Sequence, residues 1–464
     1  MKRRGVLGLM ALILAALALV AAGCGGDDED EGAGGTTATE TTGGGSTSGV
    51  TALPSSSCTK VEYGGDGDAK YLIVSDLPMQ GSSRTQTVQM VKAIRYILEQ
   101  RNWKAGEHNI AYQVCDDATA QAAKWDSGKC SQNAQAYAGN DDVIGVIGTF
   151  NSGCAQIEIP VLNQAPGGAV AMVSPANTFP CLTVGAGCES TEPDKYYPTG
   201  KRNYARVVPY DAYQAAIQAD FMKSVGVKKL YVLNDKEAYG LAVATLTRRA
   251  AQEVGIQVVG FSAWAKESAS YEAIMRKVKS SGADALFLGG LVDENGAQVI
   301  KDKVAVLGPN NGKVKLFAPD GFTQQSTIDE SGVKNAKDMY MSVAGGALDN
   351  LKGEGKTFLD GFKKQLGNEP ADPYSVYGAQ AAEVLLAAIE RSDGTRASVV
   401  EELFKTKVKD GILGTFNINE NGDVAQGKGV VIKYTMYKAA KELEVVKELT
   451  PRQELADATL EGSS

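Results

Sequence analysis

Residues 143–164 read VIGVIGTFNSGCAQIEIPVLNQ, and this stretch decides the fold class. Residues 143–148 form a continuous apolar run of strand length, and residues 156–164 carry apolar side chains at helical spacing. A short polar turn separates the two segments. A strand without polar alternation is buried on both faces, which is typical of a parallel sheet covered by helices. The stretch therefore predicts one strand–helix unit of an α/β fold.

The same alternation recurs along the chain from about residue 70 onward. Further strand candidates are short apolar runs, at residues 71–74, 169–174, 230–233, 256–261, 285–288 and 316–318. Helical patterns lie between them, at residues 88–98, 211–225, 241–254, 271–281 and 296–307. Two parallel sheets fit this order, one before about Arg206 and one after it. We therefore predict two Rossmann-like lobes.

Composition and charge exclude several classes of function. The chain has 464 residues, with 47 Lys plus Arg, 55 Asp plus Glu and a formal net charge of −8. Such an acidic chain lacks the basic field that nucleic-acid binding needs. With His108 as its single histidine, it is a poor candidate for a Ser-His-Asp triad or a multi-histidine zinc site. No P-loop and no dinucleotide-binding glycine motif after a strand occurs, so we expect no enzyme, cofactor or metal.

The N-terminal segment differs in composition from the rest. Three basic residues precede an apolar run over residues 5–22, which ends at Ala-Ala-Gly-Cys with Cys24. This pattern resembles a bacterial lipoprotein signal, in which residues 1–23 are removed and Cys24 carries diacylglycerol. An ordinary secretory leader or a single membrane helix is the alternative. Residues 24–57 are acidic, rich in Gly, Ser and Thr, and nearly free of large apolar residues, which predicts a disordered tether.

Ligands of open α/β sheets bind beyond the carboxyl ends of the strands. Four such junctions carry small polar residues, at residues 75–84, 149–153, 174–178 and 320–323. Asn151, Ser152 and Gly153 open a helix, whose free N–H groups and the Ser152 hydroxyl would bind a carboxylate. The alternative is a serine that caps its own helix. Asp320 follows a strand and would pair with an ammonium group if it is buried, or it lies in a solvated turn.

At these junctions the chain resembles the type I periplasmic binding proteins, specifically the branched-chain amino acid group that feeds ABC transporters. The resemblance spans residues 70–437 approximately and rests on six motifs in order: VIGVIGTFNSGCA (143–155), MVSPANTFPCLT (172–183), YARVVPYDAYQ (204–214), VLNDKEAYG (232–240), GADALFLGG (282–290) and APDGF (318–322). It implies two lobes, joined by three crossovers, that close on a ligand. We expect the N-terminal lobe to comprise residues 58–206 and 345–412, the C-terminal lobe residues 207–344 and 413–450, and a tail to follow over 451–464.

The resemblance also implies ligand-binding residues. Thr178 and the main chain of Asn177 match a loop that touches the ammonium and carboxylate of the ligand, although a proline-initiated turn fits too. Tyr239 matches an aromatic residue that lines the second wall of the cleft. Asp320 matches the acid that pairs with the α-ammonium group, and Ser152 lies in the matching carboxylate-binding turn.

The side-chain pocket departs from the family pattern. Leu291 stands where many relatives carry an aromatic residue. Arg84 would meet a second carboxylate on the ligand, or it starts a helix in solvent. Phe322, Tyr374 and Tyr377 would add apolar contacts, or pack into the core.

Two further features concern metals and cysteines. Residues 417–423 resemble a calcium loop, but the twelfth position is Lys428 instead of the bidentate glutamate, so we predict a hairpin turn. Of the seven cysteines, Cys24 is assigned to lipid and six remain. For an exported protein we hypothesise three disulfides, and the expected pairs are Cys58–Cys115, Cys130–Cys154 and Cys181–Cys188.

Together these features predict a lipid-anchored solute-binding protein of an ABC importer. It would capture an amino acid of the branched-chain or hydrophobic class and deliver it to permease subunits without chemical change. The alternatives are a sensory receptor module of the same fold, or a binder of urea, short amides or aromatic acids. An extracytoplasmic hydrolase is disfavoured because a nucleophile–base pair is missing. The expected location is the outer face of the bacterial cytoplasmic membrane or the periplasm, with no nucleic-acid partner.

Overall fold

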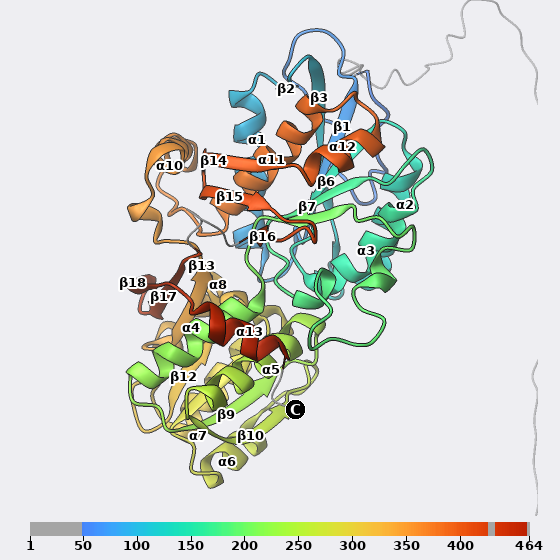
Figure 1. The fold of residues 1–464 in the computed structure, drawn as a ribbon. Coiled ribbons are helices and arrows are strands. Elements are labelled where there is room, and N and C mark those ends of the chain that lie inside the picture. The colour runs from blue at the N-terminus through green and yellow to red at the C-terminus, as the bar shows by residue number, and fades with distance from the viewer. Residues whose placement is uncertain (1–48, 426–431, 462–464) are drawn as a thin grey trace, which may run out of the picture. The chain divides into compact units, whose positions relative to one another are not determined.

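The computed structural model describes residues 49–425 and 432–461, and it contains two α/β lobes (Figure 1). The first lobe is built on a six-stranded sheet of order β2-β3-β1-β6-β7-β8. Its strands are β1 (Tyr71–Leu77), β2 (Lys104–Ala105), β3 (His108–Asp116), β6 (Val143–Gly148), β7 (Ala171–Ser174) and β8 (Tyr204–Arg206). All neighbours are parallel except β2 and β3. The fold class therefore agrees with the one predicted from the sequence.

Helices cover both faces of the first sheet. They are α1 (Arg84–Gln100), α2 (Ser127–Gly139), α3 (Ser152–Asn163), α11 (Ser375–Arg391) and α12 (Arg396–Leu403). Alternate residues of β1 enter different cores: Ile73 packs in one cluster with residues of α1 and α11, whereas Leu72 and Val74 pack in another with residues of α2 and α3. Burial on both faces explains why the strand sequences are apolar without alternation.

The second lobe is built on a seven-stranded sheet of order β10-β9-β11-β12-β13-β17-β18. Its strands are β9 (Lys229–Asn234), β10 (Gln257–Ala263), β11 (Ala285–Gly289), β12 (Lys315–Ala318), β13 (Tyr340–Ala344), β17 (Tyr434–Ala439) and β18 (Leu443–Leu449). Its helices are α4 (Asp211–Ser224), α5 (Ala238–Glu253), α6 (Glu272–Ser280), α7 (Gly296–Leu307), α8 (Gln325–Ser331), α9 (Val333–Ala336) and α13 (Gln453–Glu461). The strands β17 and β18 run antiparallel to their neighbours, and the others are parallel.

The chain passes between the lobes after β8, after β13, and between β16 and β17. The second passage leads to α10 (Gly353–Leu366), which packs on a small antiparallel sheet of β14 (Lys407–Gly411), β15 (Gly414–Ile418) and β16 (Val424–Ala425). Because β15 pairs with β14 across a tight turn at Gly414, residues 414–425 lie with the first lobe. The lobe boundary expected from the sequence, at residue 413, placed residues 414–425 in the second lobe, and the structure corrects it. The helix α13, within the expected tail, packs against α4 and α5 of the second lobe (Figure 1).

A buried ion pair fixes the hairpin that resembles a calcium loop. Arg206 at the end of β8 is fully buried, and its Nε donates to Asp423 Oδ1 at 2.7 Å. Its Nη1 donates to the main-chain oxygens of Asn177 at 3.0 Å and Phe179 at 2.8 Å. The turn between β15 and β16 closes through Gly422 N, which donates to Asn419 O at 3.0 Å. The Asp423 carboxylate therefore forms an ion pair with Arg206.

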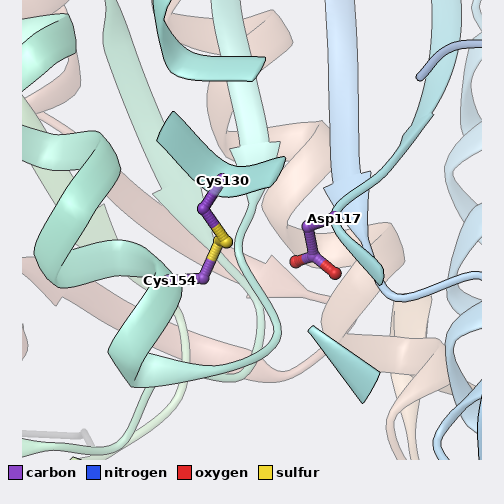
Figure 2. A group of neighbouring side chains, drawn as sticks. All are labelled: Asp117, Cys130 and Cys154. Atoms are coloured by element: carbon purple, nitrogen blue, oxygen red, sulfur yellow. A yellow bond between two sulfur atoms is a disulfide. The ribbon is translucent and has the colours of Figure 1, made fainter. Parts of the chain in front are cut away.

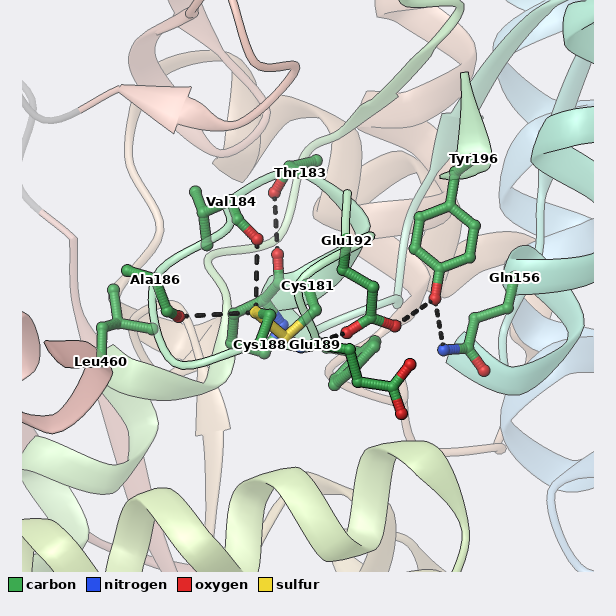
Figure 3. The surroundings of a disulfide bond; sticks show 12 residues. Gln156, Cys181, Thr183, Val184, Ala186, Cys188, Glu189, Glu192, Tyr196 and Leu460 are labelled. Carbon is green, nitrogen blue, oxygen red and sulfur yellow. Dashed lines mark hydrogen bonds between the residues drawn. A yellow bond between two sulfur atoms is a disulfide. The ribbon is translucent and has the colours of Figure 1, made fainter. Parts of the chain in front are cut away.

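The six cysteines of the described residues form three disulfides, in the pairs that the sequence led us to expect. Cys58–Cys115 ties the N-terminal segment to β3. Cys130–Cys154 joins α2 to the first turn of α3, with the Asp117 carboxylate nearby (Figure 2). Cys181–Cys188 closes a loop that lies beside Leu460 of α13 (Figure 3). Both sulfur atoms near Asp117 are therefore committed to a covalent bond.

The expected signal peptide (residues 1–23), Cys24 and most of the expected tether (residues 24–57) lie outside the described residues. Within residues 49–425 and 432–461, no helix combines the length and the apolar character needed to cross a membrane.

Candidate ligand-binding site

A small cavity, with about 20 Å³ open to the centre of a water molecule, lies between the two lobes, where strands of both sheets end. The first lobe supplies Trp125, Phe150, Asn151, Ser152, Gly153, Ala176 and Tyr374. The second lobe supplies Glu237, Tyr239, Leu291, Asp320 and Gly321. Most of these residues follow the carboxyl end of a strand, which is where open α/β sheets bind ligands.

One end of the cavity is the N-terminus of α3. Ser152 is the first residue of this helix, and no side chain caps the helix at Asn151. The first N–H groups of a helix have no intrahelical partner and carry a partial positive charge. The Ser152 hydroxyl, which is buried, accepts a hydrogen bond from Phe179 N at 3.3 Å and keeps a proton to donate. This end is therefore suited to bind an anion such as a carboxylate.

An aromatic ring lies against this helix terminus. A Cβ atom added to Gly153 would lie 2.6 Å from the Trp125 ring, so the glycine permits the indole to approach the helix backbone. Trp125 lies on β5 (Lys124–Trp125), which forms a short hairpin with β4 (Ala118–Thr119). The hairpin thus brings an aromatic wall to the anion-binding end.

The other end of the cavity is a buried carboxylate held by two tyrosines. Tyr239 Oη donates to Asp320 Oδ1 at 2.6 Å, and Tyr374 Oη donates to Oδ2 at 2.5 Å. Burial raises the pKa of Asp320, and the tyrosine hydroxyls partly offset this effect by stabilising the ionised form. Each carboxylate oxygen retains a further lone pair. This end is therefore suited to bind a cation.

Several contacts join the lobes around the cavity. The hydrogen bond from Tyr374 in the first lobe to Asp320 in the second is one of them. Lys124 Nζ lies 2.7 Å from Glu237 Oε1 and also pairs with Glu294, and both acids belong to the second lobe. Beyond these side chains, Ser83 N donates to Asp293 Oδ1 at 3.0 Å. The structure therefore shows the lobes in contact over the cavity.

The sequence-predicted residues fall into two groups. Ser152, Tyr239, Asp320 and Leu291 line the cavity, as does Tyr374. The others lie outside its lining, namely Asn177, Thr178, Arg84, Phe322 and Tyr377.

Physical reasons place three of these residues, Asn177, Phe322 and Arg84, elsewhere. The Asn177 side chain donates to the main-chain oxygens of Thr149 at 2.9 Å and Phe150 at 3.0 Å, so it shapes the cavity wall from behind. Phe322 is fully buried in the core of the second lobe, in agreement with the alternative of core packing. Arg84 is exposed at the first residue of α1, in agreement with the alternative of an arginine that starts a helix in solvent.

Sequence reasoning missed Trp125, Phe150 and Glu237. Trp125 lies in a segment without strand or helix periodicity, so no pattern linked it to the cleft. The position of Phe150, between the predicted strand and the polar turn, is a signal that could have identified it. Glu237 belongs to the same motif as Tyr239, which is a signal that could have identified it. Its ion pair with Lys124 could not be predicted, because it depends on a contact between the lobes.

Solved structures of known proteins share this architecture. A leucine-binding protein from Thermotoga maritima has a TM-score of 0.69 and 23% identity, over 82% of this chain and 99% of that one. An ABC-transporter solute-binding protein from R. palustris, solved in complex with benzoate, has a TM-score of 0.66 and 15% identity, over 82% and 97% of the two chains. The fold is that of the type I periplasmic binding proteins, as the sequence motifs predicted.

The sequence agrees with this class. The model of the family "Periplasmic binding protein" matches residues 77–435, which is more than half of the chain. The chain therefore belongs to the periplasmic binding protein family. Among curated relatives, the Leu/Ile/Val-binding protein homolog 3 of Brucella melitensis is 27% identical over 303 residues, which cover 63% of this chain and 73% of that protein.

Proposed function

We propose that this protein is the solute-binding component of an ABC importer and captures an α-amino acid in the cavity between its lobes. The observation that carries the proposal is the bipolar cavity: an uncapped helix N-terminus with Ser152 in one lobe, and the buried carboxylate of Asp320 in the other. A zwitterionic amino acid carries the two complementary charges. Because each lobe would bind one charge, the ligand would favour the closed arrangement of the lobes.

The remaining walls favour an apolar ligand side chain. Trp125, Phe150 and Leu291 line the cavity and present mainly apolar surface, while the nearby charge of Glu237 is paired with Lys124. This agrees with the names of relatives that bind leucine, isoleucine or valine. We therefore propose an amino acid of the branched-chain or hydrophobic class.

A binder of aromatic acids is the second candidate, because a benzoate-bound structure shares the fold. An aromatic acid would satisfy the helix N-terminus and stack on Trp125, but it offers no cation to Asp320. Leaving a buried carboxylate without a cation is costly, which favours the amino acid. Urea and short amides lack a full positive charge and are disfavoured for the same reason.

A ligand screen tests the proposal. The melting temperature should rise with hydrophobic L-amino acids and stay unchanged with urea, short amides and benzoate. Calorimetric titration should then show that Ser152→Ala and Asp320→Ala each weaken binding at least about tenfold, since each loses a hydrogen bond to a charged group. Arg84→Ala is the matched control, because Arg84 is exposed and outside the cavity. A shift with benzoate or an amide, and with no amino acid, would contradict the proposal.

We further propose that the mature protein is anchored by lipid on Cys24 and delivers its ligand to a membrane permease. The sequence pattern at residues 5–24 supports this proposal. In bacteria that express the full chain, Cys24→Ser should release the protein from the membrane fraction, and mass spectrometry of the wild type should find diacylglycerol on Cys24. An unmodified N-terminus at another residue would refute the anchor.

A further inference from the structure

A second buried carboxyl group, outside the lining of the cavity, interacts electrostatically with Asp320 at its cation-binding end. Asp211 is the first residue of α4, directly after the first passage between the lobes, and its side chain is fully buried. Its main-chain N–H donates to Thr178 O at 2.9 Å. Among the described residues, neither of its carboxylate oxygens has a hydrogen-bond partner. Such an orphaned group is rare in protein interiors.

The neighbours of Asp211 connect it to Asp320. The Thr178 hydroxyl lies beside Asp211 and is likewise without a partner among the described residues. One turn further along α4, the Gln214 side chain lies beside Asp320, and its Oε1 atom is also unpartnered there. The titratable groups that act on Asp211 are Asp320 after β12, Arg206 on β8, Tyr239 on α5 and Tyr434 on β17.

The one cation in this group is already occupied. The Arg206 guanidinium donates to the Asp423 carboxylate, to two main-chain oxygens at 3.0 Å and 2.8 Å, and to the Thr183 hydroxyl. Asp211 and Asp320 therefore share a buried region without a cation of their own. Two neighbouring carboxylates in such a region do not both ionise readily, and one keeps a proton. Asp320 receives two tyrosine hydroxyls, which stabilise its ionised form, so the proton belongs on Asp211.

We propose that Asp211 is a second carboxyl group of the ammonium-binding site and that the ligand ammonium group enters in exchange for its proton. The proposal rests on the proposed function. In this exchange the O–H bond of Asp211 breaks and the proton passes to the solvent. The ammonium group keeps its own protons and donates hydrogen bonds to the Asp320 carboxylate. Asp211 acts through its charge and through Thr178 and is a positioning residue.

The exchange makes affinity depend on pH. Burial and the Asp320 charge raise the pKa of Asp211 well above its ordinary value, and a bound ammonium group would lower it again. Between these two pKa values the free protein holds one proton more than the complex. The association constant for the amino acid therefore rises with pH in that interval, by up to about tenfold per pH unit. A single ionised aspartate of ordinary pKa would give constant affinity above pH 5.

Calorimetric titration of the wild-type protein with L-leucine at pH 7, in phosphate and in Tris, tests the proposal. The two buffers have different ionisation enthalpies, so the difference in binding enthalpy gives the number of protons released. We expect a net release of protons on binding, and a dissociation constant that falls as pH rises from 5.5 to 7.5. Asp211→Asn should release no proton and bind with constant affinity over this range, whereas Arg84→Ala should behave as the wild type does.

The outcomes separate the inference from the proposed function. Binding of L-leucine without proton release by the wild type would overturn the inference alone, as would proton release that persists in Asp211→Asn. Affinity that depends on NaCl but not on choline chloride at the same ionic strength and pH, without proton release, would assign the site to Na⁺ and also overturn it. A flat titration with L-leucine and with every other amino acid of the thermal screen would refute the proposed function itself. The buffer comparison needs only the wild type, so it holds even if a variant fails to fold.

Discussion

Tyr374→Phe tests whether one hydrogen bond between the lobes stabilises their contact. The variant removes only the hydroxyl that donates to Asp320 Oδ2 at 2.5 Å across the cavity. Tyr239→Phe is the matched control, because it removes the donor to Oδ1 of the same carboxylate at 2.6 Å. Tyr239 and Asp320 both belong to the second lobe, so the control leaves the contacts between lobes intact.

The magnitude follows from the charge of the acceptor. A hydrogen bond to a charged group contributes about 1.5–3 kcal/mol, and its loss should lower the ratio of closed to open protein by roughly 10- to 150-fold. Ligand affinity should fall with the closed fraction. Small-angle X-ray scattering should therefore show a larger radius of gyration for Tyr374→Phe than for the wild type, and no change for Tyr239→Phe. An equal increase in both variants, or an unchanged radius in both, would refute the role of Tyr374 as a contact between lobes.

Three further predictions concern stability and the cavity wall. Burial lowers the pKa of Lys303 from 10.5 to about 7, so between these values the unfolded chain binds more protons and the free energy of unfolding rises with pH, by up to about 1.4 kcal/mol per pH unit. Lys303→Met should lose this rise in thermal unfolding at pH 7 to 9.5. The same dependence of stability on pH in the variant and the wild type would contradict the prediction. Gly153→Ala places a Cβ atom 2.6 Å from the Trp125 ring and should weaken amino-acid binding about tenfold in calorimetry; the control Gly139→Ala, which meets no atom within 4 Å, should not. Arg206→Met leaves a buried carboxylate unpaired and should cost about 3–5 kcal/mol in urea unfolding, whereas a loss below about 1 kcal/mol would refute the buried pair.

The sheets could be predicted from the sequence because their strands are buried on both faces. Residues 143–148 were predicted as a strand and form β6, and residues 296–307 were predicted as a helix and form α7. The return of the chain to the second lobe was placed too early, since residues 407–418 form a hairpin around Gly414. Pairing partners of short strands depend on tertiary contacts, which hydrophobic periodicity does not encode.

The cavity could be predicted where a residue follows a strand within a family motif, as Ser152, Tyr239 and Asp320 do. Phe322 has the same sequence context, but its ring turns into the core, and a local pattern does not specify that direction. The sequence does not identify Asp211 as a site residue, because an acid at the first residue of a helix is common and stabilising. Only its burial without a partner marks it as unusual.

The positions of the disulfides have a consequence for the order of oxidation and folding. All six bonded cysteines lie between residues 58 and 188, and the chain after Arg206 contains no cysteine. A chain that crosses a membrane with its N-terminus first can therefore complete every covalent cross-link before any strand of the second lobe emerges. Oxidation and the folding of the second lobe are then successive events. A production host that fails to oxidise thiols would impair the first lobe and leave the second without a formed partner to close upon.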